Sequence, residues 1–170
     1  MPDPQKHAQR RGWIESIARW IPGFSGYLER EYRRDSDQLA RKWMADQLDQ
    51  AKSHLNDYMK RLTAAGKLSE LTPCQSFLTR LDTMVGRFRS APSGYSGFFD
   101  FVQIGEDELE KVYAIDVELF KSIEALAAGM EKLAASEEDP SLALSGLESE
   151  LKQIEQHFQK RKETLEGLSE

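Results

Sequence analysis

The sequence contains a single cysteine, Cys74, among its 170 residues. A lone cysteine cannot form an internal disulfide, so the sequence is not that of a small secreted domain held together by disulfide bonds. No stretch approaches the roughly 20 apolar residues that span a bilayer. The first residues also lack the uninterrupted apolar stretch of a signal peptide. We therefore expect a cytoplasmic protein that is neither secreted nor membrane-spanning.

Familiar catalytic and metal-binding motifs are missing as well. The sequence has no G-x-S-x-G element, no glycine-rich phosphate loop and no H-E-x-x-H element. Its three histidines, His7, His54 and His157, are scattered, and none has the E-x-x-H spacing from which helical bundles build di-iron sites. A helix start could activate the Cys74 thiol, but no histidine adjoins it, which favours a structural thiol. We predict a protein that is not an enzyme and has no metal or cofactor.

The net charge of −6 is distributed unevenly along the chain. Residues 1–90 carry 16 Lys and Arg against 11 Asp and Glu, whereas residues 91–170 carry 7 against 18. A basic face for an anionic partner is one explanation, and mutual attraction of the two halves in the fold is the other. The basic residues, as in the segment 29–35, are interleaved with acids. This interleaving favours mutual attraction and disfavours nucleic acid as a partner.

Alternating β-branched segments are absent, and apolar residues recur instead at intervals of three and four. This spacing predicts helices over residues 12–21, 27–65, 73–90, 106–135 and 140–168. Gly66 should end the first long helix and Asp139-Pro140 should begin the last. Short connections at 66–71 and 136–139 imply antiparallel neighbours. The predicted fold is all-α, an elongated antiparallel helical bundle or coiled coil of four main helices plus a short N-terminal helix. Residues 1–10 should be a flexible tail and residues 11–170 a single domain.

Asp116 interrupts the apolar stripe of the predicted helix 106–135, between Tyr113 and Phe120. A buried carboxylate needs a partner, because an unpaired buried charge costs several kcal/mol. We predict an arginine partner, Arg80 or Arg87, and a role in helix register rather than in catalysis.

The segment before the first long helix has aromatic residues on one helical face and arginines nearby. Such a helix can lie in a membrane interface, where tryptophan and arginine are both favourable. It can also fold back onto the bundle, with the turn at Pro22-Gly23. A second aromatic group lies in the predicted loop 91–105. The candidate interaction or structural residues are Trp13, Ile17, Trp20, Phe24, Tyr27, Tyr95, Phe98, Phe99, Asp100 and Asp116.

Two stretches of the sequence, IPGFSGYLEREYRRDSDQLAR at residues 21–41 and SGYSGFFDFVQI at residues 93–104, occur together with VYAID at residues 112–116. In this combination the chain resembles an uncharacterised family of bacterial all-helical proteins. The resemblance implies no activity and no catalytic residues. It implies that Gly26-Tyr27 and the segment from Gly94-Tyr95 to Asp100 matter together, and the two aromatic segments could pack on each other at one end of the bundle.

These observations predict a non-enzymatic helical interaction protein, an adaptor or assembly subunit. It would act through coiled-coil faces and the aromatic loop, and bind another protein or itself as a homo-oligomer. The alternative is a peripheral membrane protein of a stress-response type, held at the inner face of the membrane by its N-terminal helix.

Overall fold

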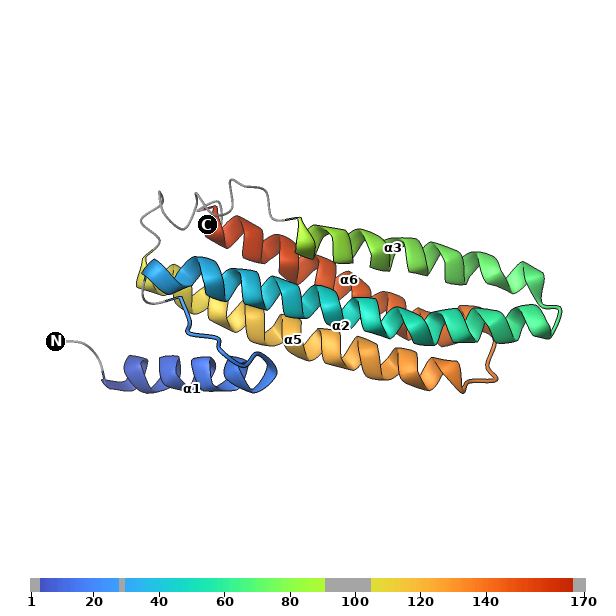
Figure 1. The fold of residues 1–170 in the computed structure, drawn as a ribbon, viewed down its shortest axis with the longest axis horizontal. Helices are drawn as coiled ribbons and strands as arrows, with labels where there is room; N and C mark the ends of the chain where they lie inside the picture. The colour runs from blue at the N-terminus through green and yellow to red at the C-terminus, as the bar shows by residue number, and fades with distance from the viewer. Residues whose placement is uncertain (1–3, 28–29, 91–104, 167–170) are drawn as a thin grey trace. The chain divides into compact units, whose positions relative to one another are not determined.

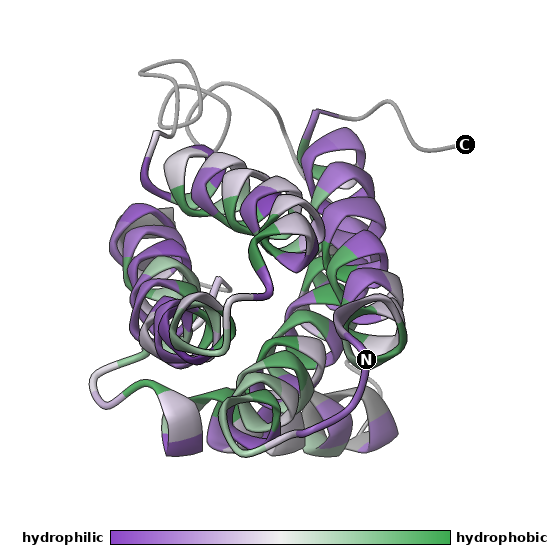
Figure 2. Ribbon diagram, turned by 90° about the vertical axis from the view of Figure 1, so that its right-hand side faces the viewer, coloured by the Kyte–Doolittle hydropathy of each residue, from purple (hydrophilic) through white to green (hydrophobic). Residues whose placement is uncertain are grey.

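The computed structural model describes residues 4–27, 30–90 and 105–166. Over these ranges the chain is all-α, as predicted, and contains no strand. Figure 1 shows the elements, which are α1 (Pro4–Trp20), α2 (Arg30–Ala64), the 3-10 helix η1 (Leu68–Glu70), α3 (Leu71–Arg89), α5 (Glu106–Ala134) and α6 (Pro140–Leu165). Figure 2 shows hydrophobic and hydrophilic residues interspersed along the helices. In α3 the buried residues recur mainly at intervals of three and four, so this helix is amphipathic.

The predicted start of the first helix is wrong. The apolar spacing placed it at residue 12, behind a tail of residues 1–10, but α1 begins at Pro4. Proline is favourable in the first turn because its missing N–H has no partner there in any helix. The Gln, Lys, Ala and Arg residues that follow have high helix propensity. The helix therefore continues into a polar stretch that apolar spacing could not assign.

The predicted helix ends at Gly66 and Asp139 are confirmed. Gly66 has φ +72°, its N–H bonds to Thr63 O, and the N–H of Lys67 bonds to Leu62 O. These two bonds are the Schellman motif, which closes a helix on a left-handed glycine. At the start of α6, Asp139 Oδ1 accepts a hydrogen bond from the Ser141 N–H at 2.9 Å, as an N-cap residue does.

The chain divides into two compact units, each assembled from segments distant in sequence. Unit 1 contains Met1–Trp43, Ser90–Phe120 and Gln156–Glu170, and unit 2 contains Met44–Arg89 and Lys121–Glu155. Residues 11–170, predicted as one domain, therefore contribute to two compact units.

Within unit 2, α2 and α3 run antiparallel, because Lys52 pairs with Asp82 and Arg89 pairs with Asp49. The short connection at 66–71 predicted this arrangement. The α5–α6 connection is held by Arg61 of α2, which donates hydrogen bonds to Ala134 O and Ser136 O. Many buried core residues of this unit follow the predicted stripes, among them Met44, Leu48, Leu55, Phe77, Leu81, Phe88, Ile123, Leu126, Met130, Leu144, Leu151 and Ile154.

Unit 1 combines α1 with the first part of α2, the first part of α5 and the last part of α6. Its interior is less uniformly apolar than the stripes suggest. Apolar residues such as Ile17, Leu109, Val112 and Leu119 are buried there. They share the interior with a group of buried polar side chains, which are Arg33, Ser36, Asp37, Asp116, Arg161 and Thr164. Asp116, one of the predicted candidate residues, belongs to this polar group, and Tyr27 is bonded to it.

Candidate functional site

The first helix docks on α5 within unit 1 and runs parallel to it. The ring of Trp13 lies 6.0 Å from that of Tyr113, and the ring of Trp20 lies 5.4 Å from that of Phe120. Trp13 and Trp20 are seven residues apart on α1, and Tyr113 and Phe120 are seven residues apart on α5. Seven residues are about two helical turns. The two contacts therefore repeat in register along the pair of helices.

A tight turn follows α1. The N–H of Phe24 bonds to Ile21 O at 3.2 Å, with Pro22 second in the turn and Gly23, at φ +87°, third. Proline in the second position and a left-handed glycine in the third are the signature of a type II turn. The predicted turn at Pro22-Gly23 is thus confirmed. The chain then returns toward Tyr113, so that Tyr27 packs on its ring at 4.9 Å.

Gly26 shows how closely this return segment is held. A Cβ atom at Gly26 would lie 2.5 Å from Tyr113 Oη and 3.2 Å from Ile14 Cδ1. The backbone is therefore enclosed between a side chain of α1 and a side chain of α5. We refer to residues 4–27, comprising α1 and its return segment, as the N-terminal arm.

All three tryptophans of the sequence lie in unit 1. The rings of Trp20, Trp43 and Phe120 contact one another pairwise, with centroids 4.9 to 6.5 Å apart. Phe120 is buried, whereas Trp13, Trp20 and Trp43 are each half-buried. We call these three residues the tryptophan surface. Large side chains of this kind contribute binding energy when a partner covers them.

Tyr27 is held at its backbone and at its side chain. Tyr113 Oη accepts a hydrogen bond from its backbone N–H, and its carbonyl accepts one from Arg33 Nε at 2.5 Å. Its hydroxyl donates to Asp116 Oδ2 at 2.5 Å. Residues of α2 and α5 therefore fix both the end of the arm and the direction of its ring.

Asp116 is paired with Arg161 of α6. Arg161 Nε donates to Asp116 Oδ1 at 2.6 Å, and Nη2 lies 3.4 Å from Oδ2 and 3.1 Å from Tyr27 Oη. Arg161 Nη1 lies 2.8 Å from Asp37 Oδ1, an ion pair in which the N–H does not point at the oxygen. We call Tyr27, Asp37, Asp116 and Arg161 the Tyr27 cluster. It joins the arm, α2, α5 and α6.

The cluster is closed to solvent, because Tyr27, Asp116 and Arg161 each have 0% exposure. Burial raises the pKa of Tyr27 well above its ordinary value, and the charge of Asp116 adds to this effect. Burial also raises the pKa of Asp116, against the lowering influence of Arg161. Burial lowers the pKa of Arg161, but Asp116, Tyr27 and Asp37 outweigh it, so this pKa lies above its usual range. The phenol thus stays a donor and the guanidinium stays charged.

This arrangement suits a structural junction better than a reaction centre. Both oxygens of Asp116 accept hydrogen bonds from within unit 1, and neither reaches the surface. A general acid or base must come within hydrogen-bond reach of its substrate. The bonds of Asp116 instead join α5 to the N-terminal arm and to α6.

The predicted partner of Asp116 is an arginine, but its identity was wrong. Arg80 pairs with Glu155 at 3.1 Å, and Arg87 Nη1 contacts Met84 Sδ. The partner is Arg161, which falls on the three-four spacing of the apolar residues in the last helix. An arginine at an apolar position was the available signal, since a core-facing cation needs a core-facing anion. Asp37 gave no such signal, because it lies in a stretch of mixed charge.

The structure brings together six of the ten predicted candidate residues, which are Trp13, Ile17, Trp20, Phe24, Tyr27 and Asp116. Phe24 packs edge-on against Tyr27 at 5.5 Å. The other four, Tyr95, Phe98, Phe99 and Asp100, lie outside the described residues. The predicted packing of the aromatic loop on the arm therefore stays a prediction.

Cys74 is buried, and burial raises the pKa of its thiol. A raised pKa lowers the fraction of the reactive thiolate, in keeping with the predicted structural thiol. Among the residues with described positions, no three His, Cys, Asp or Glu side chains are grouped so that they could hold a metal ion. In the same part of the chain, no helix combines the length and the apolar character needed to span a membrane.

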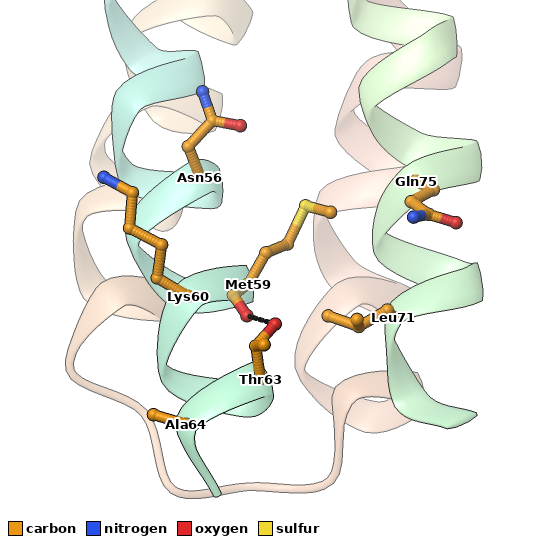
Figure 3. A pocket seen from close by; sticks show the side chains of 7 residues that line it. All are labelled: Asn56, Met59, Lys60, Thr63, Ala64, Leu71 and Gln75. Atoms are coloured by element: carbon orange, nitrogen blue, oxygen red, sulfur yellow. Dashed lines mark hydrogen bonds between the residues drawn. The ribbon is translucent and has the colours of Figure 1, made fainter. Parts of the chain in front are cut away.

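A groove between α2 and α3 of unit 2 was not predicted. It has a volume of about 680 Å³ and is lined by Asn56, Met59, Lys60, Thr63, Ala64, Leu71 and Gln75. In Figure 3, Met59 and Leu71 point into the space between the two helices. Exposed Leu68, in η1, lies four residues beyond the end of α2 in the chain. Periodicity assigns faces to single helices, so it could not show a space left between two of them.

No protein-family model, curated protein or solved structure matches this chain. The resemblance to an uncharacterised bacterial family stays a prediction.

Proposed function

We propose that the protein is a non-enzymatic adaptor or assembly subunit that binds another protein, or a second copy of itself, through the tryptophan surface of unit 1. The observation that carries this proposal is the position of Trp13, Trp20 and Trp43, which are half-buried and come from two different helices. Tryptophan and arginine are the residues most enriched at the energetic centres of protein interfaces.

The charge of the arm indicates which partner fits. Residues 4–20 carry Lys6, Arg10, Arg11 and Arg19 against Glu15. Arg11 and Arg19 are exposed. A complementary partner presents apolar side chains to the tryptophans and carboxylates to these arginines, since interfaces pair opposite potentials.

The test compares two double variants with the same change in charge. Arg11→Glu with Arg19→Glu alters the arm, and Lys60→Glu with Lys132→Glu alters exposed residues of unit 2. Each double variant and the wild type are immobilised separately and incubated with host-cell lysate to capture a partner. Light scattering on the purified proteins measures self-association. We expect the wild type and the unit 2 variant to retain the same partner, or the same dimer, and the arm variant to lose it. The proposal fails if the wild type binds nothing or if both double variants lose binding equally.

A peripheral membrane protein remains the alternative, favoured by the same tryptophans and arginines of α1. In that case α1 would have to leave unit 1, because Ile17 and Ile21 are buried there. Flotation with anionic vesicles distinguishes the two proposals. Vesicle binding by the wild type that the arm double variant abolishes supports the membrane proposal. Absence of vesicle binding by the wild type excludes that proposal.

A further inference from the structure

The return segment of the N-terminal arm buries Ile21, Phe24 and Tyr27, whereas α1 itself is held to unit 1 less completely. Over the part of α1 whose side chains the structure describes, Ile17 is fully buried, and Trp13, Ile14 and Trp20 remain half-buried. In contrast, the stretch of α5 from Leu109 to Phe120 buries most of its apolar residues. Segments with few buried contacts open at lower free energy than the core around them.

The strongest attachment of the arm lies at its end, in Tyr27. The phenol bonds to a carboxylate, and such charge-assisted hydrogen bonds contribute about 1.5–3 kcal/mol each. Gly26 links this attachment to α1, because it is enclosed between Ile14 and Tyr113. Displacing α1 therefore loosens the return segment, and removing the Tyr27 bond loosens α1.

We propose that the N-terminal arm is a strap that opens as one unit while α2, α5 and α6 stay folded, and that the Tyr27 cluster is its lock. Closing the strap assembles the tryptophan surface. Trp13 and Trp20 belong to the arm, whereas Trp43 belongs to α2. In the open form Trp20 no longer contacts Trp43.

This device regulates the interaction, a point that rests on the proposed function. A partner that contacts both the arm and α2 binds the closed form only. Partner binding and strap closure then stabilise each other to the same extent, because coupling between two equilibria is reciprocal. The opening of the strap is a property of the free protein and is measured without any partner.

The measurement is native-state hydrogen exchange on the full chain, with two matched substitutions. Ile17 of α1 and Ile154 of α6 in unit 2 both have 0% exposure. Ile17→Val removes a contact of the strap, whereas Ile154→Val removes a contact that the open form retains. Such a substitution costs about 0.5–1.5 kcal/mol, which corresponds to roughly a two- to tenfold change in an opening equilibrium.

We expect the amides of α1 to exchange faster than those of residues 109–120 and to share one opening free energy. Ile17→Val should speed their exchange by that two- to tenfold factor, and Ile154→Val should leave it unchanged while speeding the slowest core amides. Tyr27→Phe should speed α1 exchange by roughly tenfold or more, given the charge-assisted bond it removes.

If Ile154→Val speeds the α1 amides as much as the core amides, α1 exchanges through global unfolding and the strap does not exist. If Tyr27→Phe leaves α1 exchange unchanged, Tyr27 is not the lock. Should Tyr27→Phe fail to fold, the two valine variants still decide whether the strap opens on its own. A wild-type protein that binds nothing in the pull-down and does not self-associate would refute the proposed function and leave these exchange results intact.

Discussion

At Asp116, both carboxylate oxygens accept hydrogen bonds from other elements, from Arg161 of α6 and from Tyr27 of the arm. Sequence reasoning found the carboxylate and the class of its partner. It chose the wrong arginine because a helical stripe shows which residues face inward, but not which of them meet across helices. That pairing depends on the register between helices, which side-chain packing sets.

Replacing Asp116 by asparagine should lower the free energy of unfolding by about 3–5 kcal/mol, because it leaves Arg161 as a buried charge short of one partner. Arg80→Gln is the control, since its pair with Glu155 is partly exposed and should cost less than about 1 kcal/mol. Urea denaturation measures both. Equal losses in the two variants would contradict the role assigned to Asp116.

Tyr27 should make the protein sensitive to alkali. Its pKa is raised in the folded state from an ordinary value of 10.0. Above pH 10 the unfolded chain therefore releases a proton that the folded chain keeps, and this favours unfolding. The contribution of Tyr27 is complete below pH 10 and is lost as the pH rises beyond it. The difference in unfolding free energy between wild type and Tyr27→Phe should shrink from pH 9 to pH 11, and a constant difference would refute this.

Among the elements, the long helices were predictable and the path of the arm was not. The stripes of α5 and α6 are buried as predicted, because three-four spacing places those residues on one face. The turn at Pro22-Gly23 was predictable too, since proline and glycine have defined places in a type II turn. The parallel run of α1 beside α5 follows from contacts between residues about 100 positions apart, and no local pattern records these.

Gly23 and Gly26 provide a matched test of the return segment. Both have left-handed φ values, +87° and +86°, but a Cβ atom meets nothing within 4 Å at Gly23 and meets Tyr113 and Ile14 at Gly26. Gly23→Ala should cost about 1–2 kcal/mol for its backbone conformation alone. Gly26→Ala should cost a further 1–3 kcal/mol or so from overpacking. Thermal or urea unfolding compares them, and similar losses would show that Gly26 is not enclosed.

Across the whole molecule, the charge asymmetry between residues 1–90 and 91–170 is only partly reflected in ion pairs. Arg80 and Glu155 pair in the predicted sense, from the basic half to the acidic half. Arg161 and Asp37 pair in the opposite sense. Among the described residues, these two ion pairs therefore join the halves in opposite senses.

Salt should accordingly have little effect on stability. The exposed pairs contribute little individually, and the pairs of the Tyr27 cluster are buried and weakly screened. Raising sodium chloride from about 0.05 to 0.5 M should change the free energy of unfolding by less than about 1 kcal/mol. A change of several kcal/mol in urea titrations would mean that long-range attraction between the halves dominates.

The bond between Arg161 and Tyr27 joins residues 134 positions apart. During synthesis Tyr27 is made long before its partner, so the arm has no complete docking site until α6 has been translated. The arm, which is made before α5 and α6, can complete its contacts only after both helices have been translated. Until that moment its tryptophans are exposed to other proteins in the cell, including chaperones and neighbouring nascent chains.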